Sequence, residues 1–279
     1  MNFKDLSKRL LSAFFSICIL FGVLYFARTP FFQIVITLLI LGLCGLALFE
    51  FASLIQKKGI KVKKPFFIVS GLIFTFSFYF LSFSSLVPLL VFFVFFITLF
   101  VLHFSKIKNA IFSLSTNVLG LLYIALPLGL VFPLLYFSLE DGRVWLFYLL
   151  AVTKSCDIGG YFGGRFFGKK KLVAHLSPKK TIAGAVSGTV LALFVSYVFY
   201  ALSQREFFSS FSLNLPEALL LGLILAIGAQ IGDLAESLLK RDAGVKDSGR
   251  LPGFGGVLDM LDSLLFNLPI LFFYLEVLK

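Results

Sequence analysis

A stripe of charged and polar side chains runs along an otherwise apolar segment, residues 228–241. Asp233, Glu236, Ser237 and Lys240 stand at positions i, i+3, i+4 and i+7, which is the spacing of neighbours on one face of an α-helix. Charges at membrane depth are costly unless they face the interior of a helix bundle or a cavity. The stripe therefore predicts a functional site rather than a solvated helix face.

Two further carboxylates, Asp259 and Asp262, stand three residues apart on the first turns of the last apolar segment. They share a helix face, and their charges repel each other unless a cation lies between them. With Asp233 they form a set of three hard oxygen donors, which suits Mg²⁺ that bridges phosphate groups. The alternative is that they are ordinary N-terminal acids favoured by the helix dipole.

A third polar segment begins with Lys154 and Asp157, whose i, i+3 spacing lets the two charges neutralise each other on one helix face. Five glycines between positions 159 and 168 predict a close backbone approach to another helix or to a ligand. An internal ion pair with small-residue helix packing would explain the same pattern without a ligand.

A basic loop, residues 168–184, leads into the following helix. Ser177 or Thr181 can cap that helix, and Lys179 and Lys180 stand beside them. Lysines and hydroxyl groups at a helix N-terminus form anion sites, although the glycine spacing of a Walker A loop is absent. A cytoplasmic loop that is basic for topological reasons is the alternative.

The composition decides which elements must position these residues. The chain has 279 residues, of which 59% are hydrophobic and 14% are charged, and one soluble core cannot hold so much apolar mass. The long continuous apolar stretches predict an all-α polytopic integral membrane protein with about nine transmembrane helices. The expected spans are residues 10–27, 31–55, 66–83, 85–103, 116–139, 144–167, 182–202, 217–237 and 257–278.

The polar segments all fall in the second half of the chain. Residues 1–140 are therefore interpreted as an N-terminal transmembrane scaffold and residues 141–279 as a C-terminal catalytic transmembrane region, together forming one structural unit. Glu50, near the end of the second span, is interpreted as a carboxylate that reaches the lipid headgroups.

The basic residues predict an orientation. With nine spans, the N-terminus and the loops after the second, fourth, sixth and eighth spans lie on one side and hold most of the 25 Lys and Arg residues. The positive-inside rule places that side, the N-terminus and the polar segments at the cytoplasm. Topology then explains the net charge of +11 without nucleic-acid binding, and attraction of anionic lipid or phosphate is a secondary explanation.

The order of the polar segments resembles a known family. Two stretches of the chain look like the pattern of phosphatidate cytidylyltransferases, also called CDP-diacylglycerol synthases, and the match covers roughly residues 150–265. The stretches are Asp157…Tyr161…Gly164-Arg165…Ser177-Pro178-x-Lys180-Thr181, and Ser237-x-x-Lys240-Arg241…Lys246-Asp247-Ser248-Gly249…Pro252-Gly253-x-Gly255-Gly256-x-x-Asp259-x-x-Asp262.

The chain departs from the family pattern at several positions. Phe254 stands where the family usually has His, Met260 where it has Arg, and Ala183 where it has an acid or amide. The stretch between Gly249 and Pro252 looks one residue short, and Lys154 stands where an aromatic residue is common. These departures fall on groups that would orient the nucleotide or the leaving group.

The resemblance implies a reaction in which CTP and phosphatidate give CDP-diacylglycerol and pyrophosphate, at the cytoplasmic face of a prokaryotic inner or plasma membrane. It implies catalytic roles for Asp233, Lys240, Asp259 and Asp262. The three aspartates would hold Mg²⁺, alone or with a second cation. Substrate contacts are implied for Asp157, Ser177, Lys179, Lys180, Thr181, Ser237, Arg241, Lys246, Asp247, Ser248, Gly255 and Gly256.

Alternatives stay open at the level of sequence. Another CTP-dependent lipid enzyme, such as a CDP-archaeol synthase or a polyprenol or phytol kinase, would use similar residues. A cation-coupled transporter could use the aspartates as an ion site, although no internal repeat supports one. Homodimers are common in such families, but no interface can be identified from the sequence.

Overall fold

The computed structural model describes residues 22, 25–104, 108–137, 141–205, 211–249 and 255–278. Its helical segments follow the expected spans from the second to the ninth, and most of the first expected span, residues 10–27, lies outside the described residues. The helices are α2 (Pro30–Lys57), α3 (Lys64–Ser77) with η1 (Phe78–Phe80), α4 (Leu86–His103), the continuous run of α5 (Ala110–Gly120), η2 (Leu121–Ala125), α6 (Leu126–Gly129) and α7 (Val131–Tyr136), then α8 (Gly142–Phe167), α9 (Ile182–Ser203), α10 (Leu215–Asp242) and α11 (Val257–Leu278).

Among the described residues, 6 helical stretches are long and apolar enough to cross a membrane: Pro30–Lys57, Leu86–His103, Ala110–Tyr136, Ile182–Ser203, Leu215–Asp242 and Val257–Glu276. They confirm an α-helical integral membrane protein. The stretch Lys64–Phe80 is apolar but shorter, and α8 carries Lys154, Asp157 and Arg165 within its length. The total of nine spans stays a prediction.

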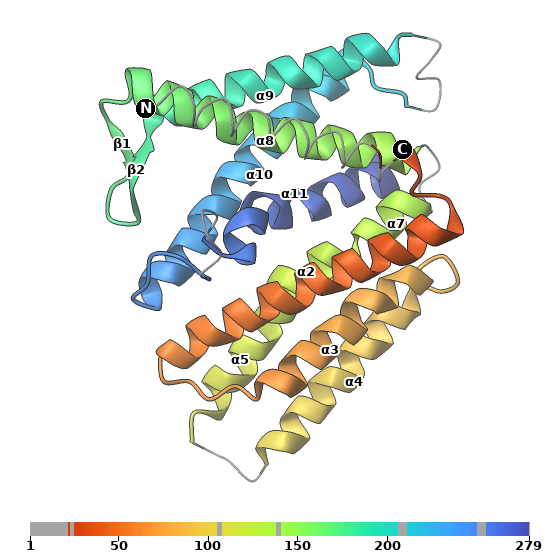
Figure 1. Cartoon of the computed structure of the whole chain (residues 1–279), viewed down its shortest axis with the longest axis vertical. Helices are drawn as coiled ribbons and strands as arrows, with labels where there is room; N and C mark the ends of the chain where they lie inside the picture. The colour runs from red at the N-terminus through yellow and green to blue at the C-terminus, as the bar shows by residue number, and fades with distance from the viewer. Residues whose placement is uncertain are drawn as a thin grey trace.

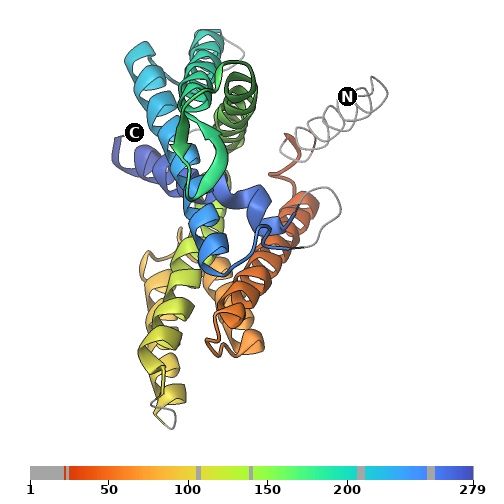
Figure 2. The same ribbon diagram turned by 90° about the vertical axis from the view of Figure 1, so that its left-hand side faces the viewer.

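The helices form one elongated bundle. Helices α8 and α9 lie at one end of the long axis, α4 and α5 lie at the other, and α11 lies between them (Figures 1 and 2). Helix α11 contacts α2 and α6 as well as α8 and α10. The last helix therefore joins the two halves of the chain.

Side-chain caps fix where two of the C-terminal helices begin. Asp141 accepts a hydrogen bond from the Arg143 backbone N–H at 3.1 Å and so caps α8. Burial would raise the pKa of the Asp141 carboxyl, but hydrogen bonds and the charge of Arg143, with a contribution from Arg28, lower it below its ordinary value. Helix α10 begins with a capping box in which Asn214 and Glu217 each accept the other's backbone N–H.

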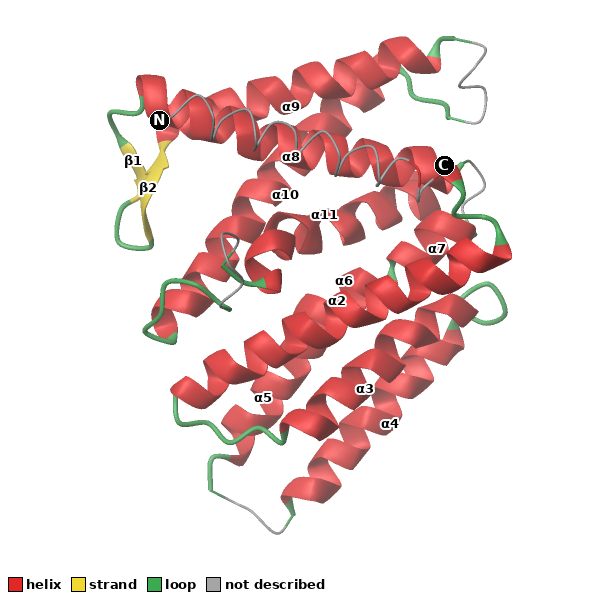
Figure 3. Ribbon diagram, in the orientation of Figure 1, coloured by secondary structure: helices red, strands yellow, loops and turns green. Residues whose placement is uncertain are grey.

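The basic loop between α8 and α9 contains the short strands β1 (Lys171–Val173) and β2 (Ser177–Thr181), which pair antiparallel (Figure 3). Only helices and loops were predicted from the sequence, so this hairpin is an addition to the all-α prediction. Thr181 ends β2 and caps α9, since its hydroxyl accepts a hydrogen bond from the Gly184 N–H at 3.1 Å. The hairpin therefore holds its lysines at a helix N-terminus, as the sequence predicted.

Glycines bring α8 and α9 into backbone contact. A Cβ at Gly159 would lie 2.8 Å from the Ser187 carbonyl oxygen, and one at Gly188 would lie 2.7 Å from the Cys156 carbonyl oxygen. Neither position can hold a larger residue unless the helices separate. The glycine-rich segment thus approaches another helix, which was one of the two interpretations of its composition.

We predict that Gly159→Leu lowers the stability of the protein by about 1–3 kcal/mol, because the added side chain forces α8 and α9 apart. Gly42→Leu is the matched control, since no atom of the described residues, apart from the adjacent backbone of α2 itself, lies within 4 Å of a Cβ built at Gly42. Both changes raise helix propensity equally. Thermal unfolding in detergent should show a lower midpoint for Gly159→Leu alone, and equal midpoints for the two variants would contradict the packing argument.

Candidate active site

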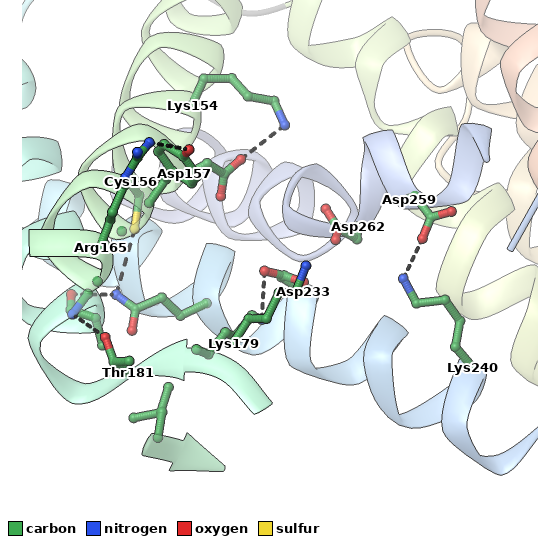
Figure 4. Close-up of a pocket in the computed structure, with 18 residues that line it drawn as sticks. Lys154, Cys156, Asp157, Arg165, Lys179, Thr181, Asp233, Lys240, Asp259 and Asp262 are labelled. Atoms are coloured by element: carbon green, nitrogen blue, oxygen red, sulfur yellow. Dashed lines mark hydrogen bonds and ion pairs between the residues drawn. The ribbon is translucent and has the colours of Figure 1, made fainter. Parts of the chain in front are cut away.

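A cavity of about 600 Å³ lies between α8, the hairpin, the start of α9, α10 and α11. The polar segments that lie far apart in the sequence meet around it (Figure 4). The structure thus brings together a core of the residues that the sequence analysis selected: Asp157, Lys179, Lys180, Thr181, Asp233, Lys240, Asp259 and Asp262.

Ion pairs between neighbouring elements neutralise most of the charge around the cavity. Lys180 of the hairpin lies 2.6 Å from the Asp233 carboxylate of α10. Lys240, in the last turn of α10, pairs with both Glu236 and Asp259. Each pair joins two charges that would be costly to bury alone. The positions of the hairpin and of α11 relative to α10 therefore depend on these pairs.

Lys154 and Asp157 on α8 form the ion pair that their spacing predicted, with Nζ 3.1 Å from Oδ2. The pair also contacts α11, because Lys154 Nζ lies 3.5 Å from the Met260 carbonyl oxygen and Ser263 Oγ lies 3.4 Å from the Asp157 carboxylate. Asp262 differs from these groups. It forms no ion pair within the part of the chain that the structure describes, and its carboxyl accepts a hydrogen bond from the Ser263 N–H at 2.5 Å.

Asp259 is held by the loop that precedes its own helix. Its Oδ2 accepts hydrogen bonds from the Ser248 and Gly256 backbone N–H groups at 3.0 and 2.7 Å. Gly255 has φ +79°, a left-handed conformation, and a Cβ there would lie 2.8 Å from Asp259 Oδ2. Ser248, Gly255 and Gly256 do not line the cavity. In this structure they orient Asp259.

Glu50 belongs to this network although it lies on α2. Its two carboxylate oxygens accept hydrogen bonds from the Val257 and Leu258 backbone N–H groups, each at 2.9 Å, and Oε2 lies 2.9 Å from Ser248 Oγ. The expectation that Glu50 reaches the lipid headgroups is wrong. It caps the N-terminus of α11, where the free N–H groups and the helix dipole favour a negative charge.

The one feature of the sequence that could have indicated a role for Glu50 is that it is an ionisable residue within an apolar span. Its partners could not be identified, because 207 residues separate Glu50 from Val257. A second residue that the sequence analysis left out of the site is Glu236. It belongs to the predicted stripe, its side chain is fully buried and it pairs with Lys240.

Besides Ser248, Gly255 and Gly256, five more of the selected residues do not line the cavity: Ser177, Ser237, Arg241, Lys246 and Asp247. Arg241 donates hydrogen bonds to the Leu176 and Val245 carbonyl oxygens at 3.3 and 3.4 Å, and so connects the hairpin to the end of α10. Lys246 and Asp247 are exposed. Substrate contacts by these residues stay predictions.

The carboxylates around the cavity could supply part of the ligand set of a Mg²⁺ ion, but not all of it. Within the described residues, no three His, Cys, Asp or Glu side chains come close enough to hold an ion by themselves. Mg²⁺ keeps several waters and commonly takes one or two carboxylates together with substrate phosphates. Asp233 and Asp262 both line the cavity and supply such oxygens, whereas both oxygens of Asp259 are already engaged.

Comparison with known proteins identifies the family. A model of the cytidylyltransferase family matches residues 7–278. The chain belongs to the cytidylyltransferase family. The name of this family denotes the transfer of a cytidylyl group. The cavity that brings together lysines and carboxylates is therefore found in a member of such a family.

Several curated relatives of this cytidylyltransferase family member are bacterial. The chain is 42% identical over 158 residues to a phosphatidate cytidylyltransferase of Chlamydia muridarum, covering 54% of this chain and 51% of the relative. It is 44% identical over 144 residues to that of Staphylococcus haemolyticus, covering 51% and 53%. It is 43% identical over 139 residues to that of Bacillus subtilis, covering 49% of each. The matched region thus spans about half the length of these relatives.

We predict that Glu50→Ala speeds amide hydrogen exchange at Val257 and Leu258 by roughly tenfold or more, because hydrogen bonds to a charged acceptor contribute about 1.5–3 kcal/mol. Glu50→Gln keeps one acceptor and should give an intermediate rate. Glu276→Ala removes an exposed carboxylate from the other end of α11 and serves as the control. Unchanged exchange in both Glu50 variants would contradict the cap.

Proposed function

We propose that this chain is a phosphatidate cytidylyltransferase, which converts CTP and phosphatidate into CDP-diacylglycerol and pyrophosphate. The observation that carries the proposal is the cavity of paired lysines and carboxylates at the ends of membrane-length helices. The family membership and the names of the relatives support it. A triphosphate and a lipid phosphate are the anionic ligands for which such a cavity is suited.

In the proposed reaction, a phosphate oxygen of phosphatidate attacks the α-phosphorus of CTP. A new P–O bond forms, the bond between the α-phosphorus and the bridging oxygen to the β-phosphorus breaks, and pyrophosphate leaves. The nucleophile is already an anion, so the protein does not need a general base. The protein contributes alignment of the two anions and neutralisation of their charge.

The lysines supply the neutralising charge. Lys179 and Lys180 would contact the triphosphate from the hairpin, and Lys240 would contact phosphate from α10. Lys180 and Lys240 are paired with carboxylates before substrate enters, so a bound phosphate would exchange a carboxylate partner for a phosphate partner. Because of that exchange, the ammonium group of the lysine is never buried without an anionic partner.

Asp233 and Asp262 would hold Mg²⁺, and Asp259 would join them when Lys240 turns toward phosphate. When bound, the ion would neutralise charge on the phosphate oxygens. The same proposal includes a second cation, bound either by the protein alone or by the protein and the substrate together. It also includes the substrate role of Asp157, whose carboxylate lines the cavity beside Lys154.

We further propose nine spans with a cytoplasmic N-terminus in a prokaryotic inner membrane. The hairpin, the carboxyl end of α10 and the carboxyl end of α2 all lie on the left side of Figure 1, and the basic loops follow these elements. The positive-inside rule then favours a cavity that opens to the cytoplasm, where CTP is found. A homodimer is compatible with this arrangement and stays a prediction.

The proposal is tested with purified protein, CTP, phosphatidate in mixed micelles and Mg²⁺, by measuring pyrophosphate and CDP-diacylglycerol. Both products should appear in equal amounts and only with Mg²⁺. Replacing phosphatidate with an archaeal ether lipid phosphate or a polyprenol tests the related lipid enzymes. No product from phosphatidate, while a competent enzyme reacts under the same conditions, would refute the proposal.

We predict that Asp233→Asn lowers turnover by about 100-fold or more, because the cavity loses a carboxylate that organises charge around the reacting phosphates. Asp242→Asn is the matched control. It lies on the same helix and loses the same charge, but its carboxylate is exposed and pairs with Lys58 at 2.9 Å. Similar turnover in the two variants would remove Asp233 from the proposed site.

A further inference from the structure

A second cavity, of about 780 Å³, lies away from the candidate active site. It is built from the loop between α2 and α3, the end of α4 and the start of α5. None of the residues that line it lines the first cavity. It belongs to the half of the chain that the sequence analysis interpreted as scaffold, so the proposed reaction gives it no role.

The charge in this cavity is unbalanced. Lys61 and Lys63 reach it from the α2–α3 loop, and Lys108 reaches it from the residues before α5. No carboxylate is among its described lining residues. In the first cavity, by contrast, Lys154, Lys180 and Lys240 each have a carboxylate partner. Three ammonium groups without an acidic neighbour favour an anion.

One wall of the cavity carries fixed polar groups. His103 Nδ1 lies 2.8 Å from the Leu99 carbonyl oxygen, and its Nε2 lies 2.9 Å from Ser113 Oγ. Asn117 Nδ2 donates to the Ser113 carbonyl oxygen at 2.6 Å. Ser113 and Asn117 are buried. The wall is therefore held in place before any ligand binds, which lowers the entropic cost of binding.

Another part of the cavity lining is apolar and consists of Phe66, Leu99 and Leu102. Val101 on α4 and Phe104, which follows the last residue of α4, are exposed apolar side chains near this end of the helix. A soluble anion would leave this apolar surface unused. A lipid places its phosphate among the lysines and its chains along the helix.

We propose that this cavity binds the phosphate headgroup of an anionic membrane lipid, separately from the reaction site. The juxtaposition of three lysines, a fixed polar wall and apolar side chains at the end of α4 carries the inference. Attraction of an anionic lipid amounts to about fivefold in affinity for each lysine near the surface.

The test uses native mass spectrometry of the full chain in a neutral detergent, with dioleoyl phosphatidylglycerol or dioleoyl phosphatidylcholine added. Phosphatidylglycerol is chosen because it is not the lipid proposed for the reaction site. The wild-type protein should retain phosphatidylglycerol more tightly. Equal retention of the two lipids would overturn the proposal.

Variants locate the site. Lys61→Gln with Lys63→Gln should weaken phosphatidylglycerol binding by about 30-fold. Lys57→Gln with Lys58→Gln removes the same charge from the end of α2, outside the cavity, and should bind as the wild type does. Equal weakening by both pairs would indicate diffuse surface charge and overturn the proposal.

Leu102→Trp narrows the cavity without changing charge and should also weaken binding. Wild-type binding by this variant would overturn the cavity assignment. Inorganic phosphate is the last arm. If it displaces the lipid at low millimolar concentration, and raises the unfolding midpoint as much as the lipid does, the site is a free phosphate site and the lipid assignment fails.

Discussion

Lys240 pairs with Glu236 on its own helix and with Asp259 on the next one, and most of the candidate site depends on this shared cation. The three side chains are largely or fully buried, and an isolated buried charge is expensive, so each of the three groups is tolerable only while the others remain in place. The pairing fixes the rotation of α10 about its axis and the position of the first turn of α11. The Lys180–Asp233 pair acts in the same way on the hairpin.

The network continues beyond these ion pairs into the first half of the chain. Asp259 is oriented by Ser248, and Ser248 Oγ lies 2.9 Å from both Asp259 Oδ2 and Glu50 Oε2. Glu50 in turn caps α11. A division of the chain at residue 140 therefore separates residues that share one hydrogen-bonded cluster, and α2 supports the site directly.

Periodicity and hydropathy were sufficient to predict the parts of the molecule that depend on local sequence. The spacing of Asp233 and Lys240 placed them on one face of α10, and the spacing of Lys154 and Asp157 placed them in contact. Contacts between distant segments have no such signal. The cap that Glu50 supplies to α11 was missed for that reason, and the hairpin was missed because its strands are short and basic. Thr181 was predicted as one of two caps because capping is local.

The arrangement of charge around the first cavity has a consequence for the orientation of anything bound there. Among the residues that line the cavity, α10 and α11 supply the carboxylates Asp233, Asp259 and Asp262 and the cation Lys240. The facing hairpin supplies Lys179 and Lys180. The cavity is therefore electrically polarised across its width, and the low dielectric of its surroundings strengthens that field. A ligand with an anionic and a neutral end has lower energy in one orientation than in the reverse, before any specific contact forms.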